Sequence, residues 1–284
     1  MAEDVLLELG GIVILGIVSQ WIAWRLRFPS IFLLLVVGFV AGPLTGVINP
    51  DALMGDMLLP FVSLSVAVIL FEGGLTLDIK ELKEIGGVLL ALIIVGVIVT
   101  WLIAATAAHY LLGLNINVAI LLAAILVVTG PTVIGPLLRH IRPSGRVSDI
   151  LKWEGIVIDP VGALLAVLVF EAIATGGLQG TTNTVLLSLG KTILFGGLSG
   201  FVFATLLVLF LKKFWIPDYL QESMTLTLVI TSYLAADYFQ HESGLFATTL
   251  MGIVIANQKF VSVKHILEFK ENLRVLIISI LFIV

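Results

Sequence analysis

The sequence predicts an all-α polytopic membrane protein with about ten membrane-spanning helices. Hydrophobic residues make up 60% of the 284 residues and charged residues only 12%, whereas a soluble domain carries roughly 25% charged residues. Long apolar runs alternate with short polar segments, and the basic residues gather on every second segment. A spanning helix needs about 20 mostly apolar residues, and lipid then solvates its outer face. These observations together favour a helical bundle in a bilayer.

The apolar runs place the expected helices in order along the chain. They cover residues 5–24, 30–47, 57–77, 85–111, 118–138, 150–174, 185–211, 221–239 and 244–255, and a further run begins near residue 273. The run 244–255 is the weakest, and the last run reaches Val284 before it is long enough to cross. We therefore expect one transmembrane domain over residues 1–284, truncated in or after its tenth helix.

The basic residues predict the orientation, because Lys and Arg are retained on the cytoplasmic side of a membrane. They follow the first, third, fifth, seventh and ninth runs: Arg25, Arg27, Lys80, Lys83, Arg139, Arg142, Arg146, Lys152, Lys212, Lys213, Lys259, Lys264, Lys270 and Arg274. Lys191 is the one basic residue on the opposite side. The pattern predicts a multi-pass protein of the plasma membrane with its amino terminus outside.

Composition also excludes several kinds of site. The net charge of −4 includes no basic stripe, so no nucleic acid partner is expected. The absence of cysteine excludes disulfides, thiolate metal sites and cysteine nucleophiles. The four histidines, His109, His140, His241 and His265, have no metal-ligand spacing. No cofactor is expected.

Asp159 is the strongest candidate for a functional side chain. A charge at bilayer depth costs at least about 2.5 to 3.5 kcal/mol, and Asp159 lies about 13 Å along the run 150–174. Pro160 removes a backbone donor, while Gly155 and Gly162 loosen the packing, so local carbonyl groups are expected to face a wet cavity. The alternative is a protonated aspartic acid hydrogen-bonded within the bundle.

The run 118–138 is expected to contain a broken helix. Thr129 stands beside Gly130 and Pro131, and Gly135 and Pro136 follow. Each proline removes a backbone donor, and each glycine permits irregular dihedral angles. Transporters use such unwound segments to present carbonyl groups to ions. We predict an extended stretch over residues 129–131 close to Asp159; the alternative is a simple proline kink.

The remaining acidic residues differ in their expected roles. Glu154 lies about 140° around the helix from Asp159, so the two do not share a face, and Glu154 is expected to pair with a basic residue beyond Val284. Glu72, in the run 57–77, is deep enough for either a structural or a functional role. Glu171 and Asp237 lie near the ends of their runs, where a solvated carboxylate is expected.

With these residues in view, the chain resembles the sodium/proton exchangers of the cation/proton antiporter superfamily, in their bacterial and archaeal branch. The resemblance runs over nearly the whole chain and rests on these motifs: Arg27-Phe28-Pro29-Ser30, Gly38-x-x-x-Gly42-Pro43, Phe71-Glu72-Gly73-Gly74-Leu75 with Asp78, and the pair of runs that carry Thr129, Pro131, Glu154 and Asp159. Three positions depart from the family pattern: Gly130 replaces an aspartate, Gly155 a serine and Ile158 an asparagine.

The resemblance implies a fold of thirteen helices in two inverted repeats with a broken crossing helix, of which this chain holds about ten. It implies that Asp159 binds either the cation or a proton, that Thr129 offers its backbone carbonyl, and that Glu72 helps through water. Gly130, Pro131, Glu154, Gly155 and Ile158 would support the site. The implied partners are Na⁺ or K⁺, H⁺, the lipid bilayer, a second copy in a homodimer, and a cytoplasmic regulatory domain beyond Val284.

The expected activity is therefore secondary active antiport, with Asp159 exposed alternately to each side, and not an enzymatic reaction. Because Ile158 is apolar and adds no second carboxylate, we predict electroneutral exchange of one cation for one proton. The main alternative is a sodium-coupled organic anion symporter of related fold, which would need more polar positions in the two central runs. A channel would need repeated rings of carbonyls or acids, and an intramembrane aspartyl protease would need a second facing aspartate.

Overall fold

The computed structural model describes residues 2–141, 143, 145–174, 181–261 and 264–284. Within these ranges every regular element is a helix: α1 (Ala2–Leu26), α2 (Ser30–Phe39), η1 (Val40–Leu44), α3 (Pro50–Met54), η2 (Gly55–Met57), α4 (Leu58–Gly74), α5 (Ile79–Ala91), η3 (Leu92–Gly96), α6 (Val97–Leu112), α7 (Ile116–Leu126), α8 (Pro131–Ile141), α9 (Arg146–Ala174), α10 (Thr181–Lys212), η4 (Asp218–Leu220), α11 (Gln221–Phe239), α12 (Ser243–Asn257) and α13 (Lys264–Ile283). The predicted all-α class is confirmed.

The predicted apolar runs fall on these helices. Within the described residues, five helices are long and apolar enough to cross a membrane: Val5–Leu26, Pro50–Gly74, Ile79–Leu112, Arg146–Ala174 and Gly190–Lys212. Four apolar helices are shorter: Ser30–Leu44, Ile116–Leu126, Ser243–Asn257 and Leu273–Ile283. The fourth run was expected from residue 85, but its helix begins at Ile79. The reason is the N-cap, because the Asp78 side chain accepts a hydrogen bond from the Lys80 backbone N–H at 2.9 Å.

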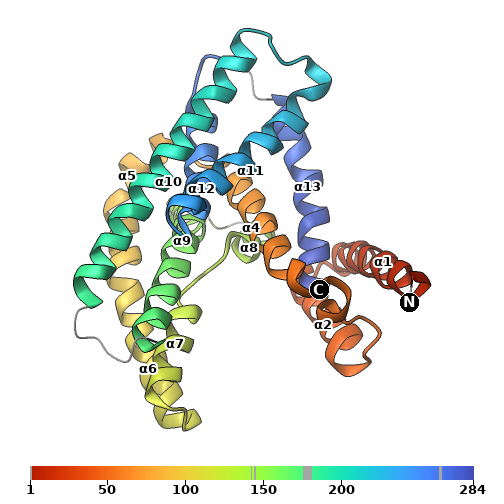
Figure 1. Ribbon diagram of the computed structural model, residues 1–284, viewed down its shortest axis with the longest axis vertical. Coiled ribbons are helices and arrows are strands. Elements are labelled where there is room, and N and C mark those ends of the chain that lie inside the picture. The colour runs from red at the N-terminus through yellow and green to blue at the C-terminus, as the bar shows by residue number, and fades with distance from the viewer. Residues whose placement is uncertain (1, 142, 144, 175–180, 262–263) are drawn as a thin grey trace.

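Helices α4, α9, α10, α11 and α12 form the centre of the molecule (Figure 1). Glycines let α12 approach its neighbours closely. A Cβ added to Gly74 of α4 would lie 2.5 Å from the Thr249 carbonyl oxygen, and one added to Gly196 of α10 would lie 2.7 Å from that of Ser243. The buried side chains around these contacts form one core: Val68, Phe71, Leu75, Ala204, Leu207, Leu211, Ile216, Leu228, Val229, Met251 and Ile255.

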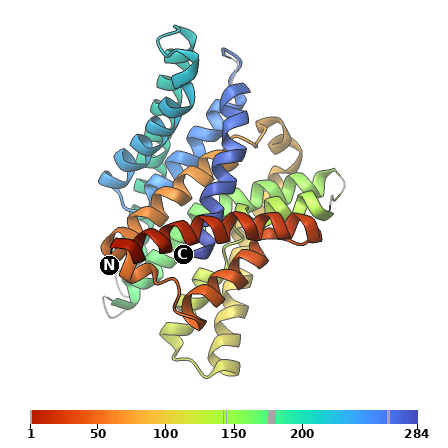
Figure 2. The same cartoon turned by 90° about the vertical axis from the view of Figure 1, so that its right-hand side faces the viewer.

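Two further groups of helices flank this centre. Helices α5 and α6 join through the π-helical turn η3 into one long rod, and α7 returns beside α6 (Figure 1). At the other side α1 crosses α13, and α2 packs against both (Figure 2). Gly38 makes the α2–α13 contact possible, since an added Cβ there would lie 2.6 Å from the Phe282 carbonyl oxygen.

Candidate cation-binding site

The helix predicted over residues 118–138 is interrupted. Helix α7 ends at Leu126, residues 128–130 have no regular secondary structure, and α8 begins at Pro131. The Gly130 carbonyl accepts hydrogen bonds from the N–H groups of Val133 and Ile134 at 3.1 and 3.2 Å, which makes Gly130 the N-cap of α8. The end of one helix and the start of another therefore meet at this break.

The assignment of Pro131 to the extended stretch was wrong. Pro131 is the first residue of α8, where its fixed φ suits the helix and its missing N–H removes no hydrogen bond. The second proline, Pro136, lies within α8, which continues to Ile141. The irregular segment is therefore Val128, Thr129 and Gly130.

This break lies against a glycine-lined face of α9. A Cβ added to Gly155 would lie 3.3 Å from the Thr129 carbonyl oxygen, and one added to Gly162 would overlap the Val128 side chain. No other residue type fits at Gly162 without movement. The two glycines let the irregular backbone approach α9 within van der Waals contact.

Asp159 lies on the same face of α9. At 3.6 residues per turn it is within about 60° of both Gly155 and Gly162, and it sits between them along the axis. Its side chain is half-buried. Within the described ranges no side chain donates a hydrogen bond to its carboxylate. Asp159 therefore lies along the same face of α9 as the two glycines that contact the break.

Glu154 and Ile158 take different positions on α9. The Thr129 hydroxyl donates a hydrogen bond to Glu154 Oε1 at 2.7 Å, so Glu154 holds the side chain of a residue in the break. The basic partner that we expected beyond Val284 stays a prediction. Ile158 is only 1% exposed and adds no polar atom beside Asp159.

Glu72 forms an ion pair that the sequence did not indicate. Arg274 Nη1 of α13 lies 3.1 Å from Glu72 Oε1 of α4, and the two side chains are 22% and 5% exposed. Sequence analysis had grouped Arg274 with the cytoplasmic basic residues. The available signal was its position, because Arg274 directly precedes the apolar residues 275–284.

The pair lines a cavity of about 300 Å³. The same cavity is lined by Gly73 of α4 and Thr76 just after it, by Ile134 and Gly135 of α8, and by Lys152 and Ile156 of α9. It therefore borders α8, which begins directly after the break, and the neighbouring helix α9.

Glu81 forms a second polar cluster that sequence reasoning missed. Lys152 Nζ lies 2.8 Å from both Glu81 carboxylate oxygens, and Trp153 Nε1 donates to Glu81 Oε2 at 2.9 Å. Trp153 is 4% exposed. These contacts attach the N-terminal part of α9 to α5.

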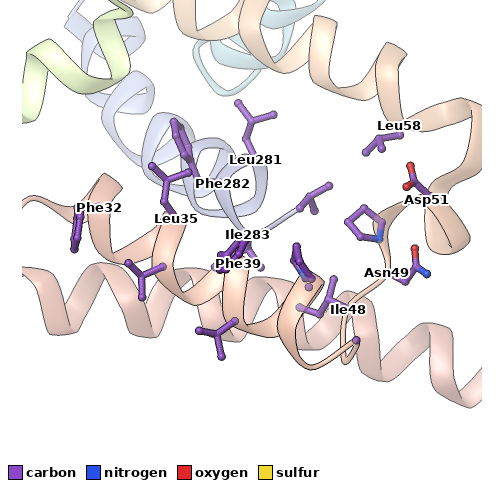
Figure 3. A pocket seen from close by; sticks show the side chains of 18 residues that line it. Phe32, Leu35, Phe39, Ile48, Asn49, Asp51, Leu58, Leu281, Phe282 and Ile283 are labelled. Atoms are coloured by element: carbon purple, nitrogen blue, oxygen red, sulfur yellow. The ribbon is translucent and has the colours of Figure 1, made fainter. Parts of the chain in front are cut away.

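A larger hollow, of about 960 Å³, lies elsewhere, between α2, η1 and the end of α13. Figure 3 shows that its labelled side chains are mostly apolar, among them Phe32, Leu35, Phe39 and Phe282. None of the candidate site residues lines it. Although this hollow is large, it is not a candidate ion site, because it offers few oxygen ligands.

Comparison with known proteins identifies the family of this chain. The family model "Sodium/hydrogen exchanger, transmembrane" matches residues 11–284. A K(+)/H(+) antiporter NhaP of Alkalimonas amylolytica is 27% identical over 276 residues, which cover 94% of this chain and 46% of the relative. The Na(+)/H(+) antiporter 1 of Methanocaldococcus jannaschii is 26% identical over 289 residues, covering 97% of this chain and 66% of the relative.

The fold matches a solved antiporter. The structure of the sodium proton antiporter MjNhaP1 from Methanocaldococcus jannaschii at pH 8 superposes with a TM-score of 0.78 at 21% identity, covering 98% of this chain and 70% of that one. The chain thus has the antiporter fold and spans about half to two thirds of the curated relatives named above. With a family model that matches nearly all of its length, this chain belongs to the transmembrane sodium/hydrogen exchanger family.

Proposed function

We propose that this chain exchanges a monovalent cation, Na⁺ or K⁺, for H⁺ across the plasma membrane. The observation that carries the proposal is the position of the Val128–Gly130 break against the face of α9 that holds Asp159. Unpaired backbone carbonyls at membrane depth need a hydrated or ionic partner. A carboxylate beside them supplies the negative charge that a cation requires.

The exchange cycle follows from the cost of a buried charge. When Asp159 is ionised, a cation bound to it offsets part of that cost, and after the cation leaves a proton does the same. The empty, ionised site crosses poorly, so cation and proton move in opposite directions as the site is exposed alternately to each side. Thr129 would contribute its backbone carbonyl to the bound cation, and Glu154 would keep Thr129 in place through the 2.7 Å hydrogen bond.

The three departures from the family pattern limit the available ligands. Gly130, Gly155 and Ile158 provide no side-chain oxygen, so the cation would rely on Asp159, Glu72, backbone carbonyls and water. Gly155 leaves little room for more, since an added Cβ would lie 3.1 Å from Ile134 Cγ1.

The activity is tested by proton movement in inside-out membrane vesicles that contain the full-length protein. We expect addition of Na⁺ or K⁺ to an acidified vesicle to release protons, with choline as the cation that produces no response. Comparing the proton release caused by Na⁺ with that caused by K⁺ shows which cation the protein prefers. Vesicles that respond to neither ion more than protein-free vesicles do would refute the proposal.

Electroneutral exchange is the second expected result. Asp159 is the group that takes up and releases the proton, and the neighbouring Ile158 is buried and apolar, so one cation replaces one proton. In proteoliposomes with the membrane voltage clamped at different values, the exchange rate should stay the same. A rate that changes with voltage would show that a second charge moves with Asp159.

We also propose a homodimer with the amino terminus outside. The orientation is supported by the basic residues, which place Lys80 and Lys191 on opposite sides. The chain contains no cysteine, so a single cysteine at either position can be labelled selectively. An impermeant reagent added to whole cells should label the Lys191→Cys protein and not the Lys80→Cys protein; the reverse would overturn the orientation.

A further inference from the structure

The Glu72–Arg274 ion pair is largely buried. A buried ion pair contributes little net stability, so stability alone does not explain why this pair is there. Its atoms lie 3.1 Å apart, and the Glu72 side chain is 5% exposed. Removing two charges from water costs several kcal/mol per ion, and a buried pair is often no more stabilising than apolar residues of similar size. Removing one partner alone is strongly unfavourable, because it leaves a buried charge without compensation. A cation beside the Glu72 carboxylate therefore offsets part of the cost of burying its charge.

The cavity next to the pair is large enough to admit such a cation with water. Its volume is about 300 Å³, several times the roughly 30 Å³ that a water molecule occupies in the liquid. Of its lining side chains, Ile134 of α8 lies against Gly155 of α9, and Ile156 of α9 lies against Gly73 of α4. An ion in this cavity would therefore lie beside Glu72 and between α4, α8 and α9.

We propose that the Arg274 guanidinium stays paired with the Glu72 carboxylate until the transported cation displaces it. Arg274 thereby sets the apparent affinity of the protein for that cation. This inference rests on the exchange activity proposed above. The guanidinium and an arriving Na⁺ or K⁺ compete for the same carboxylate oxygens. The binding free energy of the transported cation is therefore reduced by the free energy of separating Arg274 from Glu72.

The inference is tested by the concentration of Na⁺ and K⁺ that gives half-maximal exchange, measured in proteoliposomes of the full-length protein. We expect Arg274→Gln to lower this concentration about tenfold, within the range of couplings between contacting charged residues. Arg274→Lys, which keeps a competing charge, should stay within about threefold of the unmodified protein. Glu72→Gln should raise the concentration, and adding Arg274→Gln to it should then have no further effect, because the competition is gone.

Two variants guard against trivial explanations. Arg146→Gln removes an arginine whose side chain is 75% exposed and whose partner Glu84 is 3.7 Å away, and it should leave the half-maximal concentration unchanged. Arg274→Met is a second neutral replacement, for use if the Gln protein does not fold. Cation-dependent thermal stabilisation of the purified protein gives a second measure of affinity that needs no transport.

The outcomes separate the two proposals. An unmodified protein that shows neither exchange nor stabilisation by Na⁺ or K⁺ removes the proposed function, and this inference with it. An active unmodified protein whose neutral Arg274 variants bind the cation equally or more weakly overturns the inference alone. So does an effect of Arg274→Gln that is the same with Glu72 and with Gln at position 72.

Discussion

We expect Asp159→Asn to abolish cation/proton exchange while the protein still folds and inserts into the membrane. The substitution keeps the size of the side chain but removes its charge and its titration. The neutral amide binds neither the cation nor a proton, so the site carries neither ion whichever side of the membrane it faces. The measurement is cation-induced proton release in inside-out vesicles, which should fall to the level of vesicles without the protein.

A matched change elsewhere on α9 provides the control. Glu171 is an exposed carboxylate near the end of the same helix, so Glu171→Gln makes the same chemical change away from the break and should keep exchange near normal. Both proteins should be present in equal amounts in the membrane and have similar thermal unfolding midpoints. Near-normal exchange by the Asn variant would remove Asp159 from the mechanism.

Gly162→Ala is expected to have the second largest effect. The added methyl group would overlap the Val128 side chain, and such overpacking costs about 1–3 kcal/mol of unfolding free energy. Relief of the overlap requires the break to move away from α9, and a displacement of about 1 Å at a reacting site can cost 100-fold in rate. We expect the maximal exchange rate to fall at least about tenfold, with a lower thermal unfolding midpoint.

Gly86→Ala on α5 is the control for this change. A Cβ added to Gly86 meets nothing within 4 Å, and alanine favours a helix over glycine by up to about 1 kcal/mol. This variant should therefore exchange normally and unfold at the same or a higher temperature. If Gly162→Ala also exchanged normally, close contact between α9 and Val128 would be unnecessary for transport.

The sequence allowed the helices and the existence of the break to be predicted, because both depend on local properties. Apolar length determines where helices form in a bilayer, and the glycines and prolines after Val128 disfavour continuous helix. The misplacement of Pro131 has the same origin. Proline suits an irregular segment and the first position of a helix equally well, so composition alone does not separate the two.

The contacts that complete the candidate site could not be predicted, because they join segments that are far apart in the chain. Glu72 lies on α4 and Arg274 on α13, and neither residue has a neighbour in sequence that indicates the other. The role of Gly155 and Gly162 was only partly visible. Looser packing around Asp159 was expected from them, but their fit to Thr129 and Val128 depends on the three-dimensional path of the break.

The attachment of α9 to α5 restricts how Asp159 can move. The Glu81 carboxylate accepts hydrogen bonds from Lys152 Nζ and Trp153 Nε1, so these two neighbouring residues restrict the rotation of α9. Twisting α9 about its own axis would separate Trp153 Nε1 from Glu81 before it turned Asp159 away from the break, because a hydrogen bond weakens steeply as its angle departs from linear. A movement of α9 that reorients Asp159 and keeps these contacts must therefore move α5 together with α9.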